Sequence, residues 1–175
     1  DQVSIFEKNI KKITGSKYAL GVGNGTDALF LVLKAFNIGK GDEVITTPFT
    51  FIATTASIAT AGAKPVFVDI KDDYNIEENK IEKSITKKTK AILPVHWAGA
   101  SPNMTKIMSI AKKYKLEVVE DACMGIGAKI NNKSPGTFGK VNAFSMHPLK
   151  SLNVMGDGGM ITTNDTKIAN WIIKY

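Results

Sequence analysis

A lysine and an aspartate stand where their side chains could do chemistry together. Lys150 ends the segment 145–150, which begins with Ser145 and leads into the glycine-rich segment 156–159. Asp121 is a carboxylate that closes an apolar run upstream. A lysine from which water is partly excluded loses its proton more easily, and only the neutral amine condenses with an aldehyde to a Schiff base. An aspartate that faces a pyridine nitrogen keeps the ring protonated and electron-withdrawing. The pair therefore suggests pyridoxal phosphate chemistry.

The composition is that of an ordinary globular protein. The 175 residues are 43% hydrophobic and 22% charged, which is enough for one domain with a real core. Both ends fall inside helical patterns, so we expect a single domain over 1–175 that is truncated at both ends. No apolar run is long enough to span a membrane, no leader opens the chain, and Cys123 has no cysteine partner. These features favour a cytoplasmic protein without a membrane partner.

The net charge of +7 raises the question of nucleic-acid binding, because 23 Lys and Arg face 16 Asp and Glu. The lysines are densest in the stretch 80–90, which has no interleaved aromatic residue and no motif that reads bases. We interpret this stretch as a solvated helix face, and we expect no nucleic-acid partner.

Short β-rich runs alternate with helical patterns along the chain. Helices with one apolar stripe separate most of the strands, which predicts parallel strands covered on both faces. The last two strands are joined by a loop with Pro148 and three glycines instead, so the final strand should return antiparallel. The sequence thus predicts an α/β fold with a mainly parallel seven-stranded sheet. The expected strands are 18–23, 43–47, 65–69, 91–96, 116–121, 141–145 and 160–163, and the internal helices are 26–36, 52–61, 77–84 and 104–114.

Ligands of such sheets bind beyond the carboxyl ends of the strands. Asp121 and Ser145 end the fifth and sixth strands, and the loop 24–27 leads from the first strand into a helix whose free N–H groups attract a phosphate. Thr26 either caps this helix or offers its hydroxyl to a phosphate while the N–H of Asp27 does likewise, and both readings stay open. Thr26 also stands where a dinucleotide-binding turn needs its third glycine, which disfavours NAD.

Several other residues invite a functional reading. Glu120 and Asp121 are adjacent in a strand and point to opposite faces, so at most one of them faces a site. Cys123 is better explained as a small buried thiol than as a nucleophile. Phe51 and Trp97 each follow a strand and either stack on a flat ring or pack under a loop. No metal site is expected, because the remaining aspartates lack the spacing of a calcium loop (Asp42, Asp69, Asp72 and Asp73).

Taken together, the motifs resemble the DegT/DnrJ/EryC1/StrS family of sugar aminotransferases. The resemblance covers essentially the whole chain and implies the large domain of a pyridoxal-phosphate transferase of fold type I, a three-layer αβα structure, with the C-terminal small domain absent. Eight ordered segments carry it: GNGTDAL at 23–29, GDEVI at 41–45, TFIAT at 50–54, GAKPVFVD at 62–69, PVH at 94–96, EDA at 120–122, GTFG at 136–139, and FS at 144–145 leading to GDGG at 156–159.

The resemblance implies a role for each matching residue. Lys150 would form the Schiff base with pyridoxal phosphate and later shuttle a proton, and Asp121 would pair with the pyridinium nitrogen. The implied reaction moves an amino group, commonly from glutamate, to a keto-sugar that is usually nucleotide-linked, in a homodimer with a shared active site. Phosphate contacts would come from Thr26, Asp27 and Ser145, and a stacking contact from Phe51. The implied cofactor-binding set is Gly25, Thr26, Asp27, Phe51, Asp121, Met124, Ser145 and Lys150.

Two positions depart from the family pattern. Met124 stands where glutamine is usual, and Ser151 stands where asparagine is common. One alternative function is a sugar dehydratase of the same family, in which the lysine is typically replaced by histidine, so Lys150 argues against it. Another is a catalytically silent or regulatory relative, which Met124 and the missing small domain keep open.

Overall fold

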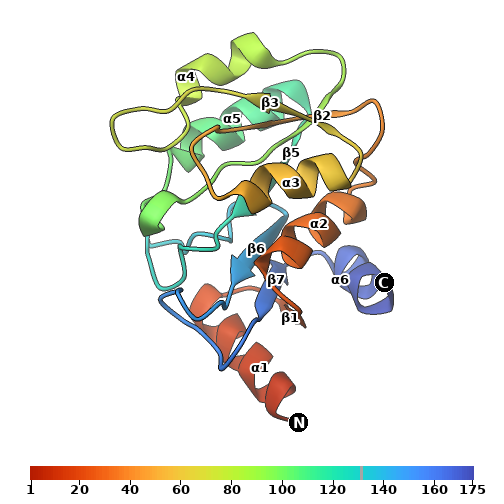
Figure 1. The fold of residues 1–175 in the computed structure, drawn as a ribbon, viewed down its shortest axis with the longest axis vertical. Coiled ribbons are helices and arrows are strands. Elements are labelled where there is room, and N and C mark those ends of the chain that lie inside the picture. Colours follow the sequence, from red (N-terminus) through yellow and green to blue (C-terminus); the bar gives the residue numbers. More distant parts are fainter. Residues whose placement is uncertain (131) are drawn as a thin grey trace.

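The computed structural model describes residues 1–130 and 132–175, and within them seven strands form one mixed sheet (Figure 1). The strands are β1 Tyr18–Val22, β2 Glu43–Thr46, β3 Lys64–Phe67, β4 Thr89–Ile92, β5 Glu117–Asp121, β6 Val141–Ser145 and β7 Gly159–Thr163. Their order in the sheet is β1-β7-β6-β5-β4-β2-β3. Only β7 runs antiparallel to its neighbours among the described strands, which confirms the predicted fold class.

The antiparallel return of β7 follows from the segment 146–158, which contains no helix in the structure. A parallel connection needs a crossover of a dozen or more residues, usually a helix. Without one, the chain turns back beside β6, and Ser145 pairs with Gly159. The loop 146–158 therefore starts and ends at the same edge of the sheet.

β4 ends at Ile92, earlier than the predicted strand 91–96. Pro94 explains the difference, because proline has no N–H to donate to a sheet ladder. Pairing with β5 resumes only as a single parallel bridge between Val95 and Asp121. This bridge holds the end of β5 in place, next to the segment that leaves β4.

Six α-helices accompany the sheet among the described residues: α1 Gln2–Thr14, α2 Gly25–Ala35, α3 Ile52–Thr60, α4 Glu78–Ile81, α5 Met104–Tyr114 and α6 Thr166–Lys174. The predicted helix over 77–84 is divided between α4 and a 3₁₀ turn at Glu82–Ser84. None of the helices in the described part of the chain combines the length and the apolar character that a membrane crossing requires.

Helices cover both faces of the sheet (Figure 1). Along each strand, side chains alternate between the two faces. α2, α3 and α6 pack on one face, against residues such as Val44 and Val119. α4 and α5 pack on the other face, against the neighbouring residues Ile45 and Val118, and α1 covers that face near β6. The result is the three-layer αβα arrangement that the resemblance implied.

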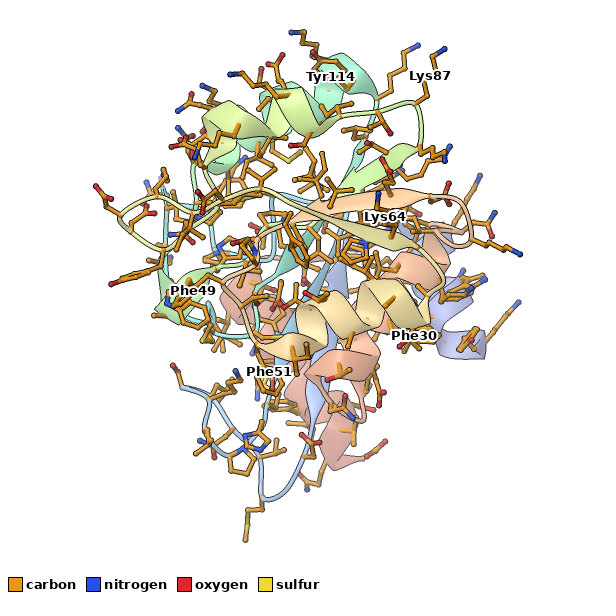
Figure 2. The ribbon with its side chains drawn as sticks, turned by 45° about the horizontal axis from the view of Figure 1, so that its top comes forward. Phe30, Phe49, Phe51, Lys64, Lys87 and Tyr114 are labelled. Atoms are coloured by element: carbon orange, nitrogen blue, oxygen red, sulfur yellow. The ribbon has the colours of Figure 1, made fainter. Side chains whose placement is uncertain are left out.

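The lysine-rich stretch 80–90 lies on the surface. All of its lysines are exposed, and Lys87 projects into solvent (Figure 2). The stretch runs from the end of α4 through the 3₁₀ turn and the following loop to the first two residues of β4, so only part of it is helical. Its charges are therefore hydrated, as a solvated face requires.

The loop that leads into β6 is held by one buried carboxylate. Glu120 accepts hydrogen bonds from the N–H groups of Gly136 at 2.7 Å, Phe138 at 2.6 Å and Gly139 at 2.6 Å. Its Oε2 also lies 2.8 Å from Nε2 of the buried His96. A buried carboxylate is tolerated because these donors replace the water that it loses. Glu120 thereby fixes the path by which the chain enters β6.

A substitution at Gly136 tests how tightly this loop packs against the core. Its φ is +78°, and a Cβ there would overlap the ring of Phe144, which is buried in the core. We expect Gly136→Ala to lower the free energy of unfolding by about 3 kcal/mol, because left-handed strain adds to the steric overlap. Urea unfolding followed by circular dichroism measures the loss.

Gly15→Ala is the matched control for this substitution. Gly15 has a similar φ of +75°, but a Cβ there meets nothing within 4 Å. The control should cost only about 1 kcal/mol, which is the backbone strain alone. Equal losses in the two variants would contradict the tight packing of Gly136 against Phe144.

Candidate active site

A cavity of about 600 Å³ lies at the carboxyl edge of the sheet, where β5 and β6 end. Its walls come from the N-terminus of α2, the segment that opens α3, the ends of β5 and β6, and the loop after β6. All eight residues of the predicted cofactor-binding set line it, namely Gly25, Thr26, Asp27, Phe51, Asp121, Met124, Ser145 and Lys150. The structure thus brings the whole set together, while the role of each residue stays a prediction.

Asn24, and not Thr26, caps α2, so that reading of Thr26 was wrong. The Asn24 Oδ1 accepts the N–H of Asp27 at 2.8 Å, and its Nδ2 donates to the Asp27 carboxylate at 3.0 Å. Asparagine is a favoured capping residue, and an acid three positions later is the matching signal in the sequence. The Asp27 N–H is thus occupied by the cap. Gly25 and Thr26 contribute the other N–H groups of the first turn, which have no carbonyl partner within the helix.

Gly25 allows α2 to approach the end of β6 closely. A Cβ at position 25 would lie 2.8 Å from the Cβ of Ser145 and 3.0 Å from the Sγ of Cys123. Any larger residue would push the helix away from the strand. The glycine therefore places the positive end of the α2 dipole beside the hydroxyl of Ser145, which is an arrangement suited to an anion.

Asp121 is held by two hydrogen bonds at the end of β5, where it is only 5% exposed. Its Oδ2 accepts from Thr54 Oγ1 at 2.7 Å, and its Oδ1 accepts from the Cys123 N–H at 3.2 Å. A carboxylate has about four lone-pair sites, so it can still accept a hydrogen bond from a group in the cavity. Asp121 is thus anchored and still able to bind.

Thr54 is a contact that the sequence analysis missed. It lies in the first turn of α3, is 1% exposed and lines the same cavity. Its neighbours on the buried stripe of α3 are Ser57 and Ile58. A hydroxyl on a buried stripe needs a partner inside the protein, and this requirement was the available signal.

Glu120 points away from the cavity and toward the loop 136–139. Asp121 lines the cavity instead. The prediction that at most one of these two acids faces a site is therefore confirmed. The alternation of side chains along β5 is the physical reason.

Lys150 lies on a turn after β6, with its backbone N–H donating to the carbonyl of His147 at 2.8 Å. The Asn153 side chain donates to the Lys150 carbonyl at 3.0 Å. The side chain of Lys150 is half-buried and lines the cavity. Two local hydrogen bonds therefore fix the backbone from which the amine extends.

Cys123 lies between the helix and the carboxylate, and its environment keeps the thiol protonated. Burial raises the pKa of Cys123 well above its ordinary value, and the negative charge of Asp121 raises it further, while Lys150 opposes the effect. A protonated thiol is a weak nucleophile. Cys123 is half-buried and lines the cavity, so it is less buried than predicted, but its raised pKa agrees with the prediction that it is not a nucleophile.

The two candidate stacking residues have different surroundings. Phe51 lies at the mouth of the cavity and is 69% exposed, so its ring is available to a ligand (Figure 2). Trp97 instead packs edge-on against Phe49 at 4.7 Å between ring centroids, and Phe49 stacks on Tyr74 at 5.3 Å. Trp97 does not line the cavity. Of the two aromatic residues, only Phe51 is placed to stack on a ring.

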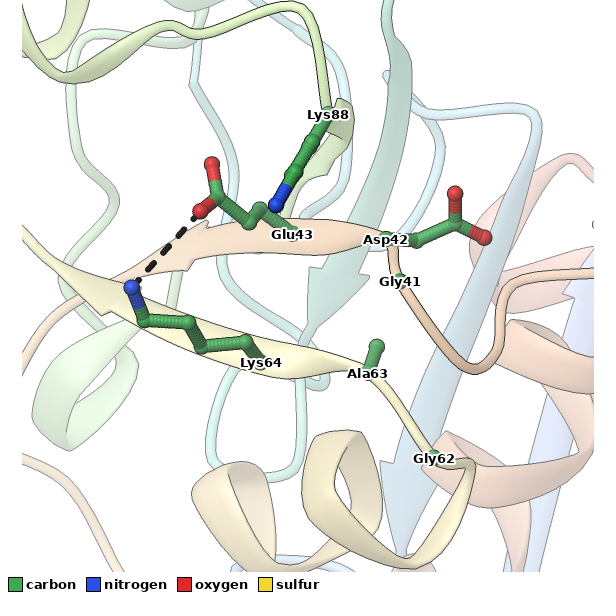
Figure 3. A pocket seen from close by; sticks show the side chains of 7 residues that line it. All are labelled: Gly41, Asp42, Glu43, Gly62, Ala63, Lys64 and Lys88. Carbon is green, nitrogen blue, oxygen red and sulfur yellow. Dashed lines mark ion pairs between the residues drawn. The ribbon is translucent and has the colours of Figure 1, made fainter.

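A second hollow of about 240 Å³ lies at the opposite edge of the sheet, where β2 and β3 begin (Figure 3). Lys64 and Glu43 form an ion pair across it at 3.7 Å, and the hydroxyl of Thr86 donates to Glu43 at 2.6 Å. The charges that line this hollow are thus partly satisfied by one another. None of the predicted site residues lies there.

Comparison with known proteins identifies relatives of this chain. A "Pleiotropic regulatory protein" of Geobacillus stearothermophilus is 49% identical over 97% of the chain, which covers 46% of that protein. A UDP-N-acetyl-3-dehydro-alpha-D-glucosamine 3-aminotransferase of Acidithiobacillus ferrooxidans is 44% identical over 96% of the chain, again 46% of that protein. The chain therefore spans about half the length of the curated relatives that it matches.

The same similarity holds in three dimensions. The crystal structure of NtdA from Bacillus subtilis with bound cofactor PMP superposes with a TM-score of 0.95 at 36% identity, and the match covers all of this chain and 40% of that one. The model of the DegT/DnrJ/EryC1/StrS aminotransferase family matches residues 1–175. This chain therefore belongs to the DegT/DnrJ/EryC1/StrS aminotransferase family.

Proposed function

We propose that this chain forms the pyridoxal-phosphate-binding large domain of a sugar aminotransferase. One observation carries the proposal: a lysine amine, a buried carboxylate, a serine hydroxyl and a helix N-terminus meet in one cavity, in a chain of this family. No single sequence motif would support this function by itself. The chain spans about half of its relatives, so the complete activity is proposed here.

The residues of the cavity fit pyridoxal phosphate. The close approach that Gly25 permits sets a helix N-terminus beside Ser145, which suits the phosphate. Asp121 keeps acceptor capacity after its two hydrogen bonds, which suits a protonated ring nitrogen. Phe51 offers an open aromatic face at the mouth. When bound, the cofactor supplies an aldehyde that condenses with amines and a ring that accepts electrons.

Each residue has a defined task in this proposal. Lys150 holds the cofactor covalently through Nζ, and as a free amine it then carries a proton between the substrate carbon and the cofactor. Asp121 holds the proton on the ring nitrogen through its negative charge. Thr26 and Ser145 bind the phosphate together with the free N–H groups of the first turn of α2, while Asp27, whose own N–H is engaged by Asn24, holds that turn in shape. Met124 lines the cavity without a polar group, so it contributes only packing there.

We propose glutamate as the amino donor and a keto-sugar, linked to a nucleotide, as the acceptor. The relative from Acidithiobacillus ferrooxidans carries the name of an enzyme that acts on a UDP-linked sugar, which supports this class of substrate. Lys150 supports an aminotransferase over a dehydratase, since that rival lacks the lysine.

A regulatory relative is the second candidate, because a chain that is 49% identical carries the name of a regulatory protein. The half-reaction with glutamate distinguishes the two. An aminotransferase converts its bound aldehyde to the amine when glutamate is added, and the change in absorbance is direct to measure. A regulatory protein that binds the cofactor without turnover would show no such change.

We also propose a homodimer in which the partner covers this cavity. Large apolar side chains are exposed in two segments that contribute Phe51 and Leu149 to the cavity wall, and exposed apolar surface of this kind marks an interaction site. They lie at the start of α3 and in the loop after β6, and they are Phe51, Ile52, Leu149 and Met155. Covering them would also exclude water from Lys150.

Borohydride reduction tests the role of Lys150. We expect the reduced protein to carry the cofactor on Lys150, located by peptide mass spectrometry, because reduction makes the Schiff base permanent. Lys150→Ala should lose the label and lower turnover by about 10³-fold or more. Lys167→Ala removes an exposed lysine of α6 and should change neither. A label on another lysine would contradict the assignment.

Asp121→Asn tests the role of the buried carboxylate. The substitution keeps the size and removes the charge, so we expect the rate with glutamate to fall by roughly 10²-fold while the melting temperature stays close to its original value. Glu120→Gln, at the neighbouring position, should lower the melting temperature instead, because its carboxylate holds the loop 136–139. A nearly full rate in Asp121→Asn would disprove the proposed role.

Ile52→Glu tests the proposed dimer. Ile52 is 68% exposed at the start of α3, and a charge there should weaken an apolar interface and shift the protein toward monomer in analytical ultracentrifugation. Ile173 is similarly exposed at 67% on α6, so Ile173→Glu is the control for a charge placed elsewhere. The proposal fails if the unaltered protein is a monomer, or if Ile52→Glu leaves the dimer intact.

A further inference from the structure

A short chain of hydroxyl groups leads from α3 to Asp121. Thr54 Oγ1 donates to Asp121 Oδ2 at 2.7 Å, and Thr50 Oγ1 lies 2.7 Å from Thr54 Oγ1. Thr54 and Asp121 are both buried, while Thr50 is half-buried. All three residues line the cavity. The two hydrogen-bonded hydroxyl groups therefore lie within the site, next to the carboxylate.

The direction of these hydrogen bonds is set by the number of protons. A threonine hydroxyl has one proton to donate, and an ionised carboxylate can only accept. Because Thr54 gives its proton to Asp121, it must accept from Thr50.

The second oxygen of Asp121 is held from the other side. Its Oδ1 accepts the backbone N–H of Cys123 at 3.2 Å. With one donor on each oxygen, the plane of the carboxylate is fixed. Charge-assisted hydrogen bonds of this kind are roughly twice as strong as neutral ones.

We propose that Thr54 is a positioning residue, which orients the Asp121 carboxylate toward the cavity, and that Thr50 supports it. The inference rests on the proposed function, in which Asp121 binds the protonated ring nitrogen. Thr54 acts through Asp121, so its effect should disappear when the carboxylate is removed.

The test compares Thr54→Val with Thr54→Ser in the affinity for pyridoxal phosphate, measured by absorbance titration of the apoprotein. Valine has nearly the shape of threonine and cannot donate, whereas serine keeps the hydroxyl. We expect Thr54→Val to bind the cofactor roughly tenfold more weakly, since a hydrogen bond to a charged group is lost. Thr54→Ser should remain within about twofold of the unaltered protein.

Two further variants serve as controls for this comparison. Thr60→Val makes the same change at an exposed position at the end of α3 and should leave the affinity unchanged. Thr50→Val should weaken binding less than Thr54→Val does, because it removes only the donor to Thr54. If Thr54→Val does not fold, Thr54→Ala removes the same hydroxyl with less steric risk and serves in its place.

A double-mutant cycle with Asp121→Asn decides the mechanism. The loss of affinity caused by Thr54→Val should shrink to about twofold or less in the Asp121→Asn background. An equal loss in both backgrounds would overturn the inference, because Thr54 would then act independently of the carboxylate. So would a Thr54→Val variant that binds like the unaltered protein. Failure of the unaltered protein to bind pyridoxal phosphate would overturn the proposed function itself, and the inference with it.

Discussion

The carboxylate of Glu120 is the buried charge around which this end of the sheet is built. Three backbone N–H groups of the loop 136–139 and the ring of His96 converge on it. Through these contacts, the end of β5 holds two other segments: the one that follows β4 and the loop that leads into β6. A buried charge without such donors would be costly, so loop and carboxylate stabilise each other. Because Glu120 is held in this way, the backbone of the next residue, Asp121, is also held in place.

The site lies where the ends of β5 and β6 meet the N-terminus of α2. Gly25 brings the N-terminus of α2 against Ser145, and Asn24 completes the cap that fixes the helix start. On the other side, Thr54 reaches from α3 to Asp121. The contacts join lining residues from different elements, so the packing of the cavity's own walls preorganises it. The loop that carries Lys150 is the more open side, and it begins and ends at one edge of the sheet.

Much of the fold could be predicted because the signals are local. Short β-rich runs indicate the strands, and the helix-free loop before β7 indicates its antiparallel direction. The end of β4 was missed because Pro94 interrupts the ladder inside a run that still looks like a strand. Capping of α2 was one of two open readings of Thr26, and it was wrong because Asn24 is the N-cap. Thr54 was missed because its partner, Asp121, lies 67 residues away in the chain.

The sequence by itself determined the types of the reactive groups and the order of the elements that carry them. β-rich runs and helical patterns are properties of neighbouring residues in the chain, so the α/β alternation can be read directly. The alternation in turn places Asp121 and Ser145 at the carboxyl edge of the sheet. Only the tertiary structure decided which groups touch. Three contacts join segments that are distant in the sequence. Glu120 binds the loop 136–139, Gly25 packs against Ser145, and Thr54 donates to Asp121. Their distances depend on how sheet and helices pack, and packing is a property of the whole chain.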